Sequence, residues 1–318
     1  MDRRRFLQSV AVLGVSALPS FRALAHAATY AGKLQPAASA LGPQLFGTFL
    51  PPNQCIPNLV DYWDLRTTAS KVFTDTPGSN PLTADFDTIR HWKSMLGNLP
   101  VVAGKGLEGP AYRTAVFGKM PGAEFSEGQQ GLVGNFVRSF GSGLSIILVG
   151  KLTADAYSYR PLLSMAPHLL VQPYNTPDGL LICRNTDDGV TLSRYENDWP
   201  SGSPAYVAAA AQQPAGMPCI TVYTLDKVAD IVDAAWATYR GIAHISVNGG
   251  HIQAYDNYQD VTDIDVGLLG IGTRTNDPLR LASKNVLFGV YITDGPVSPQ
   301  SMQKFYDSYI NQLMPGVF

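Results

Sequence analysis

Aromatic and polar residues alternate in one stretch of the sequence, 193–207, which reads SRYENDWPSGSPAYV. The C–H faces of sugars stack on aromatic rings, while sugar hydroxyls need polar side chains as hydrogen-bond partners. We therefore predict a glycan-binding surface in this Pro- and Gly-rich loop, formed by Arg194, Tyr195, Asn197, Trp199 and Tyr206. The open alternative is that the aromatic rings only anchor a long loop to the core.

Aspartates are dense in a second stretch, 256–265, which reads DNYQDVTDID. Calcium takes six to eight oxygen ligands without strict geometry, and carboxylates in a loop supply them. The cluster therefore predicts a calcium site, the single cofactor that the sequence suggests, at Asp256, Asp260, Asp263 and Asp265. The alternative is a solvated acidic loop, since the glycine and glutamate pattern of an EF-hand is absent.

A third group of residues has the types that a polysaccharide lyase uses. Such an enzyme needs a Tyr/His pair as base and acid, and an Arg or Asn that neutralises the sugar carboxylate. The sequence offers these types at His251, Tyr255, Tyr258 and Arg274. Tyr255, Tyr258 and Arg274 also belong to the predicted glycan-binding surface. The alternative is that His251 is a hairpin residue and that the tyrosines serve only for packing of strands and loops.

Short runs rich in Val, Ile, Thr and Tyr, bounded by turn residues, must position these side chains. They predict the strands of an antiparallel all-β sandwich, at 143–152, 179–185, 189–197, 218–226, 242–248, 251–257, 267–274 and 285–295. Asn248-Gly249 predicts a tight hairpin turn, because both residues tolerate a positive φ.

Two segments space their apolar residues as a helix does. In the first, with a loop as the alternative, the stripe is Val228, Ile231, Val232, Ala235, Trp236 and Tyr239. The second begins with Ser298 as cap and Pro299 in the first turn. Its apolar face is Met302, Phe305, Tyr306, Tyr309, Ile310 and Leu313.

Seven phrases, taken in order, resemble the laminin-G-like, concanavalin A-like lectin/glucanase superfamily. They are DYWDLRTTAS (61–70), IRHWKSMLGN (89–98), PGAEFSEGQQG (121–131), SIILVGKL (145–152), ISVNGG (245–250), LLGIGTR (268–274) and FGVYITDGPVSPQSMQKFYDSYI (288–310). The resemblance implies a concanavalin A-like jelly-roll sandwich of two antiparallel sheets with a short C-terminal helix, as a single domain over 45–318. It also implies a concave face or rim loops that commonly bind glycans, sometimes with calcium.

The glucanase branch of this superfamily carries E-x-D-x-x-E on a strand, with the two glutamates as nucleophile and acid/base. The nearest match runs from Asp263 to Leu268, and Leu268 stands where the second glutamate is required. Leucine can neither donate nor accept a proton, so the match argues against this hydrolase class. The sequence also lacks G-x-S-x-G, H-E-x-x-H and C-x-x-C. It therefore favours a protein without catalytic residues and leaves a lyase open.

The N-terminal residues 1–27 resemble a twin-arginine (Tat) export signal. An arginine cluster precedes Phe6 and Leu7, an apolar run extends from Val10 to Leu18, and Ala25-His26-Ala27 resembles a cleavage site. The run is too short to span a bilayer, so we expect the Tat machinery as a transient partner, no stable membrane anchor, and a periplasmic or secreted protein. An ordinary secretory signal is the alternative, and 28–44 is predicted to be a flexible lead-in.

Charge and cysteine content narrow the partners. The net charge of the whole chain is −2. Removing residues 1–27 deletes four arginines and one aspartate, which takes the charge to −5. This acidic balance argues against nucleic acid as a partner. Three cysteines allow one disulfide in an oxidising compartment, for which Cys183 and Cys219 are the favoured pair.

Together these observations predict a secreted or periplasmic, lectin-like protein that recognises an extracellular or cell-envelope glycan. Two alternatives stay open. One is a polysaccharide-degrading enzyme on the same fold, a lyase rather than a hydrolase. The other is an adhesion or structural module that binds protein through the same face.

Overall fold

The computed structural model describes residues 48–66, 70–104, 106–126, 128–141, 143–153, 160–166, 180–184, 189–196, 205–213, 215–233, 236–248, 253–257, 264–275 and 284–318. Within these ranges it describes the backbone alone for 189–196, 205–212, 227–233, 236–243, 253–257 and 264–265. The predicted export signal and lead-in, 1–44, lie outside the described residues. In the described part of the chain, no helix is long and apolar enough to cross a membrane.

The first sheet contains eight antiparallel strands. Their order is β15 (Gln253–Asn257), β14 (Trp236–Val247), β13 (Cys219–Asp233), β8 (Gly143–Leu152), β17 (Asn285–Asp294), β6 (Met120–Phe125) and β5 (Ala111–Phe117). The eighth, β1 (Leu59–Asp64), pairs with the second half of β17. Every residue of β17 except the last is buried, as its central position requires.

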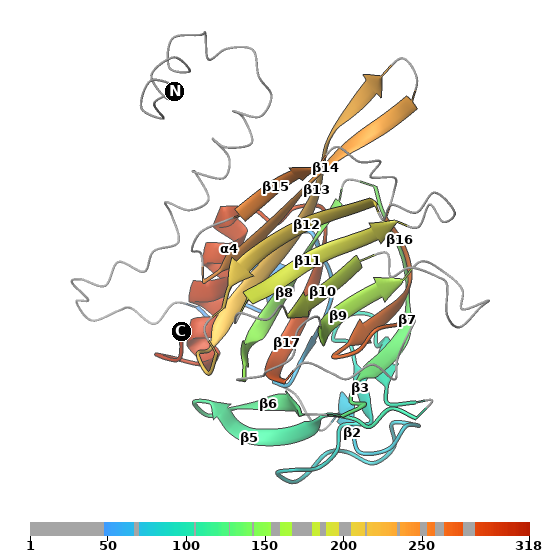
Figure 1. Ribbon diagram of the computed structural model, residues 1–318. Helices are drawn as coiled ribbons and strands as arrows, with labels where there is room; N and C mark the ends of the chain where they lie inside the picture. The colour runs from blue at the N-terminus through green and yellow to red at the C-terminus, as the bar shows by residue number, and fades with distance from the viewer. Residues whose placement is uncertain are drawn as a thin grey trace, which may run out of the picture.

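The second sheet contains nine strands. Their order is β12 (Ala205–Gln212), β11 (Gly189–Glu196), β10 (Leu180–Arg184), β9 (Arg160–Ala166), β16 (Ile264–Ile271), β7 (Leu132–Phe140), β4 (Pro100–Val102), β3 (His91–Lys93) and β2 (Val72–Phe73). Figure 1 shows this sheet in front of the first, with β9 to β12 lying over β8 and β13. The two sheets enclose one continuous apolar core, which includes Trp63, Trp92 and Phe136. The predicted all-β jelly-roll sandwich is thus confirmed.

The predicted C-terminal helix is also confirmed. The hydroxyl of Ser298 accepts a hydrogen bond from the Ser301 N–H at 3.1 Å, and Pro299 opens α4 (Pro299–Phe305). The helix continues as a π-helical turn, η1 (Tyr306–Ile310), and a last short helix, α5 (Asn311–Leu313). A short helix, α3 (Pro52–Cys55), precedes the first strand. The buried rings of Phe305 and Tyr309 pack on Tyr291 of β17, so this helical segment covers the outside of the first sheet.

Phrases that lie far apart in the sequence meet near β1. The buried carboxylate of Asp61 accepts hydrogen bonds from the Ser94 hydroxyl at 2.7 Å and from the backbone N–H groups of Leu96 and Gly97. The indole of Trp63 donates to the Leu99 carbonyl at 3.2 Å. DYWD and HWKSMLGN are therefore joined through one buried acid.

The predicted helix over 228–239 is wrong. The segment belongs to β13 and β14, with Asp233 paired to Trp236 and Val232 to Ala237. Val, Ile, Trp and Tyr are good strand formers, and pairing with a neighbour outweighs the helical spacing. Beyond Asp226 and Gly241 the two strands pair only with each other among the described residues. They form the ribbon that projects at the top of Figure 1.

Asn248 is held by hydrogen bonds of its side chain and backbone as well as by its positive φ. Its φ is 48°, as the turn prediction required, and β14 and β15 do form an antiparallel hairpin. The side-chain oxygen of Asn248 also accepts a hydrogen bond from the Ile220 N–H at 2.7 Å. Asn248 N–H donates to the Ile220 carbonyl at 2.9 Å. The residue thus ties the end of β14 to the start of β13.

Candidate functional site

The stretch predicted to be a glycan-binding loop is a strand hairpin at its two ends. Arg194 and Tyr195 belong to β11, and Tyr206 belongs to β12, where it pairs directly with Tyr195. Arg194 and Tyr195 thus lie in the strand predicted at 189–197, whereas Tyr206 belongs to a strand where a loop was expected. Alanine-rich VAAAAQ is a poor strand signal, which is why β12 was missed. Asn197 and Trp199 lie outside the described residues.

Two other predicted residues lie at the same edge of the sandwich. Tyr255 and Asp256 belong to β15, within the strand predicted at 251–257, and pair with Ala243 and Ile242 of β14. The backbone of β12 lies against β14 and β15, so the strands that carry Tyr206 and Tyr255 meet where the two sheets approach each other. Tyr258 and His251 lie outside the described residues.

Arg274 is separated from this edge. It is half-buried and follows β16 in a bend that Gly272 begins. The sheet register places Tyr195 in the row of Leu268. After Gly272 the chain folds back, because the Ser164 hydroxyl donates to the Thr273 carbonyl and accepts from the Thr275 N–H, both at 2.9 Å. Three strands intervene between β16, which Arg274 follows, and β12, which carries Tyr206.

The predicted calcium site is divided by the fold. Asp256 lies in β15 of the first sheet, and Asp265 lies in β16 of the second. Asp260 and Asp263 lie outside the described residues. Among the side chains that the structure describes, no group of three or more His, Cys, Asp or Glu residues could hold a metal ion. The calcium site therefore stays a prediction.

The proposed disulfide does not form in this structure. All three cysteines lie within the described residues, all are buried, and no disulfide joins Cys183 to Cys219. Burial raises the pKa of the Cys219 thiol to about 11. The fold therefore reaches its packed state without a covalent link.

A surface site that the sequence did not predict lies at the edge strand β5. Its centre is Phe86, whose side chain is 64% exposed and whose backbone has φ 67°. A bulky residue rarely adopts this left-handed conformation, which costs free energy and is found mostly where the surrounding structure enforces it. Here Phe86 N–H donates to the Tyr112 carbonyl, and Tyr112 N–H donates to the Asp87 carbonyl, both at 2.7 Å. The loop thus holds an apolar ring out in solvent.

Arg113 supports that ring from one side. Its guanidinium carbon lies 4.1 Å from the centre of the Phe86 ring, in the geometry of a cation–π contact. Arg113 pairs with Gly122 and Ala111 with Glu124 across β5 and β6, so Arg113 and Glu124 are diagonal neighbours on one face. Nη1 of Arg113 donates to Oε2 of Glu124. The hairpin register therefore places the guanidinium beside Glu124.

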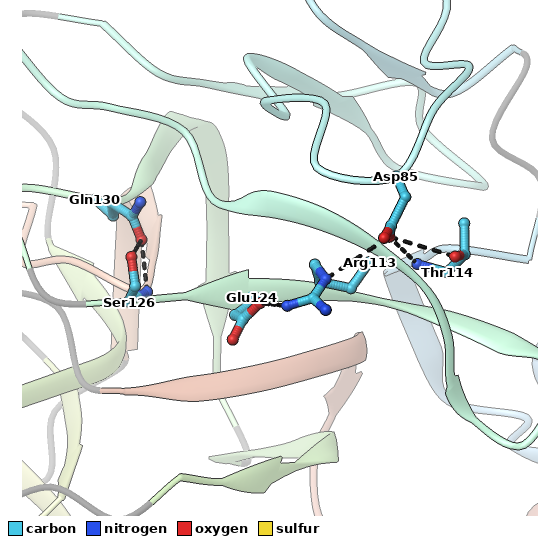
Figure 2. A network of polar contacts seen from close by, with 6 residues as sticks. All are labelled: Asp85, Arg113, Thr114, Glu124, Ser126 and Gln130. Atoms are coloured by element: carbon cyan, nitrogen blue, oxygen red, sulfur yellow. Dashed lines mark hydrogen bonds and ion pairs between the residues drawn. The ribbon is translucent and has the colours of Figure 1, made fainter.

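Asp85 completes the cluster from the Phe86 loop. Figure 2 shows Arg113 between Asp85 and Glu124, with Nε of Arg113 3.7 Å from Oδ1 of Asp85. The same oxygen accepts hydrogen bonds from the N–H of Thr114 at 2.8 Å and from its hydroxyl at 3.3 Å. The charged side chains of Asp85, Arg113 and Glu124 are 39, 32 and 32% exposed. They are therefore held in place and still open to a ligand.

Neighbouring turns stiffen both ends of this cluster. Oδ2 of Asp87 accepts from the N–H groups of Ala84 at 2.8 Å and Thr83 at 3.1 Å. These two bonds lower the pKa of Asp87, so it carries a negative charge at neutral pH. After β6, the side-chain oxygen of Gln130 accepts from the N–H and hydroxyl of Ser126, as Figure 2 also shows.

The sequence held one signal of this site. TADFDT (83–88) places an aromatic residue between two aspartates, and the same mixture of residue types predicts a glycan-binding surface at 193–207. Nothing in the sequence connects Phe86 to Arg113, because the contact depends on how the 82–89 segment docks along β5. Tertiary structure was needed to show that the ring is exposed and backed by a cation.

A second polar cluster is buried beneath the C-terminal helical segment. The carboxyl of Asp64 is fully buried and accepts hydrogen bonds from the Tyr309 hydroxyl and from Arg66 N–H at 3.2 Å. Burial raises the pKa of Asp64, while Tyr309 and Arg66 oppose that rise. Because the acid is shielded from solvent, we assign this cluster to holding the helix rather than to binding a ligand.

Comparisons with known proteins show only distant similarity. No protein-family model and no curated protein sequence matches the chain, so the superfamily resemblance stays a prediction. Among solved structures, Trypanosoma rangeli sialidase in complex with sialic acid aligns over 94% of this chain and 39% of its own, at 12% identity and a TM-score of 0.47. The same sialidase with 2,3-difluorosialic acid aligns over 79% and 33%, at 10% identity and a TM-score of 0.46.

A smaller protein is similar over part of the chain. The CBM40 of Ruminococcus gnavus IT-sialidase, bound to alpha2,3 sialyllactose, aligns over 56% of this chain and 92% of its own, at 12% identity and a TM-score of 0.38. This chain spans a third to two fifths of the length of the Trypanosoma sialidases. At such TM-scores the similarities assign neither a family nor an activity.

Proposed function

We propose that this protein is exported and binds a glycan, with Phe86 as the stacking platform. The observation that carries the proposal is an aromatic ring held out in solvent by a strained backbone, with a guanidinium on one face and carboxylates beside it. Since Arg113 covers one face of the ring, the other face is available to the C–H surface of a sugar.

The polar groups beside the ring suit sugar hydroxyls. Carboxylates accept hydrogen bonds only, and each oxygen has more than one acceptor position. Oδ1 of Asp85 and Oε2 of Glu124 face Arg113, which leaves the other oxygen of each carboxylate outside these contacts. A sugar on the Phe86 ring would donate its hydroxyl protons to them. Because the side chains are already held by Thr114 and Arg113, binding loses little side-chain freedom.

Export and the remaining sequence predictions belong to the same proposal. A Tat-type signal over 1–27 would deliver the protein to the periplasm or the exterior, where cell-envelope and extracellular glycans occur. The β12–β15 edge, with Tyr195, Tyr206 and Tyr255, is a second candidate surface because its strands converge. Calcium at the acidic stretch 256–265 remains part of the proposal.

The test is binding of the full chain to a panel of soluble polysaccharides, by affinity electrophoresis and calorimetry, with and without calcium. Replacing a central aromatic contact by alanine costs about 2 kcal/mol, or roughly a thirtyfold loss of affinity at 1.4 kcal/mol per factor of ten. We expect this loss for Phe86→Ala. Val137→Ala is the matched control, since Val137 is an apolar side chain on β7 that is 69% exposed.

The outcomes separate the alternatives. If the wild type binds no glycan at millimolar concentration, with or without calcium, the proposal is wrong and a protein-binding module becomes the better interpretation. If glycans bind and Phe86→Ala binds as well as Val137→Ala, the platform is wrong. Loss of binding in Tyr206→Ala instead would move the site to the β12–β15 edge.

A further inference from the structure

We infer that the Phe86 platform selects uncharged sugars and rejects acidic ones. This inference rests on the proposed function and concerns its substrate class. It follows from the charges around the ring and from the donors that Arg113 has already committed.

Negative charge exceeds positive charge around the platform. Asp85 and Asp87 flank Phe86 in the sequence, and Glu124 lies on the neighbouring strand. The guanidinium of Arg113 compensates one of these three carboxylates. An acidic sugar on the ring would therefore approach a site whose own charges sum to −2.

Arg113 is poorly placed to attract a sugar carboxylate. A guanidinium recognises a carboxylate best through two parallel N–H donors. Nη1 is bonded to Glu124, while Nε is buried, faces Asp85 at 3.7 Å and makes no hydrogen bond. The guanidinium has two pairs of parallel donors, Nε with Nη2 and Nη1 with Nη2, and one donor of each pair is thus occupied or shielded. One face of the guanidinium also lies over Phe86. Arg113 acts as a positioning residue that orients the two acceptors.

The size of the effect follows from the excess charge. A like charge about 6 Å away in water weakens binding by about threefold, and two such charges weaken it by about tenfold. Salt screens this repulsion, because the Debye length falls from above 10 Å at low ionic strength to a few ångströms near 1 M. Binding of an uncharged sugar should not respond to salt.

The experiment uses the full chain and a matched pair of ligands: an uncharged polysaccharide and the same backbone after partial oxidation to uronic acids. At low salt we expect the uncharged polysaccharide to bind at least about tenfold more tightly, with a difference that shrinks as salt is raised. Tighter binding of the oxidised polysaccharide by the wild type, with Phe86→Ala still losing affinity, would overturn the inference and leave the proposed function intact. If neither ligand binds, or Phe86→Ala has no effect, the proposed function itself fails.

A charge-neutralising variant tests the same idea by a gain of binding. Glu124→Gln removes one negative charge but keeps an amide oxygen as an acceptor, so the affinity for the oxidised polysaccharide relative to that for the uncharged one should rise about threefold or more. Glu108→Gln makes the same chemical change at an exposed position outside the cluster and should leave both affinities unchanged. Equal behaviour of the two variants toward the oxidised ligand would contradict the inference.

Discussion

Removal of one buried hydroxyl, in Tyr309→Phe, should destabilise the fold in a way that depends on pH. The hydroxyl donates to the fully buried carboxyl of Asp64 at the end of β1. The only other hydrogen bond that this carboxyl accepts, among the described contacts, is from Arg66 N–H at 3.2 Å. Tyr309 lies in η1, so the bond joins the C-terminal helical segment to the first sheet.

The magnitude follows from the burial of the acceptor. A hydrogen bond to a charged buried group contributes about 1.5–3 kcal/mol, and phenylalanine preserves the ring contacts with Phe305 and Tyr291. We therefore expect the free energy of unfolding to fall by about 1.5–3 kcal/mol once the pH is above the folded pKa of Asp64, where the carboxylate is charged. At pH 4 the loss should be smaller, because a protonated Asp64 depends less on a donor.

The sign of the pH dependence comes from the raised pKa of Asp64. The folded state holds this proton more tightly than the unfolded chain does. The stability that this bound proton contributes is therefore complete below the unfolded pKa of about 3.9, and it is lost as the pH rises through the folded pKa of Asp64. Since Tyr309 lowers that pKa, its removal shifts the loss to higher pH and deepens it.

The assay is urea unfolding of the full chain between pH 4 and 8. Tyr306→Phe is the matched control, because the half-buried Tyr306 hydroxyl donates to the Phe318 carbonyl at 3.3 Å and faces no buried acid. It should cost less than about 1 kcal/mol at every pH. Equal losses in the two variants, or a Tyr309→Phe loss that is the same at pH 4 and pH 8, would refute the reasoning.

Two further predictions concern packing. Gly272 has φ 72°, and a Cβ there would lie 2.2 Å from Cε1 of Phe125, so Gly272→Ala should lower the free energy of unfolding by about 2–4 kcal/mol. Gly216 is the control, because it has φ 77° and open space around it, and Gly216→Ala should lower the free energy of unfolding by about 1 kcal/mol. Similar losses in the two variants would show that the Phe125 contact is unimportant. All three cysteines are buried, and burial raises the pKa of the Cys55 and Cys219 thiols. A thiol reagent at pH 8 should therefore label three thiols in denaturant and none in the folded chain, and rapid labelling of the folded chain would contradict the packing.

Local patterns predicted the C-terminal helix and eight strands, β8, β10, β11 and β13 to β17, but not β1 to β7, β9 or β12. The runs at 143–152 and 285–295 became β8 and β17 almost residue for residue, because both strands are central and nearly every position is buried. The Ser298 cap and the following proline marked the helix start correctly, since capping is an interaction within a few residues. Such signals depend on neighbours in the sequence and can be recognised without the fold.

Patterns failed where pairing with a neighbouring strand decides the conformation. The apolar spacing of 228–239 fits a helix, yet the two halves of the segment pair with each other as β13 and β14. The alanine-rich β12 becomes a strand because β11 lies beside it with Tyr195 opposite Tyr206. Strand pairing supplies hydrogen bonds that local propensity does not record.

The sequence by itself determined the class of fold, the antiparallel strands and the capped C-terminal helix, because turn residues, apolar runs and caps act over short distances. Tertiary structure alone decided the candidate site. Phe86, Arg113 and Glu124 come from a loop and two strands, and they meet because the 82–89 segment docks along the edge of β5. Exposure of a ring and the charge around it are properties of the packed chain, so residue types alone could not single out Phe86.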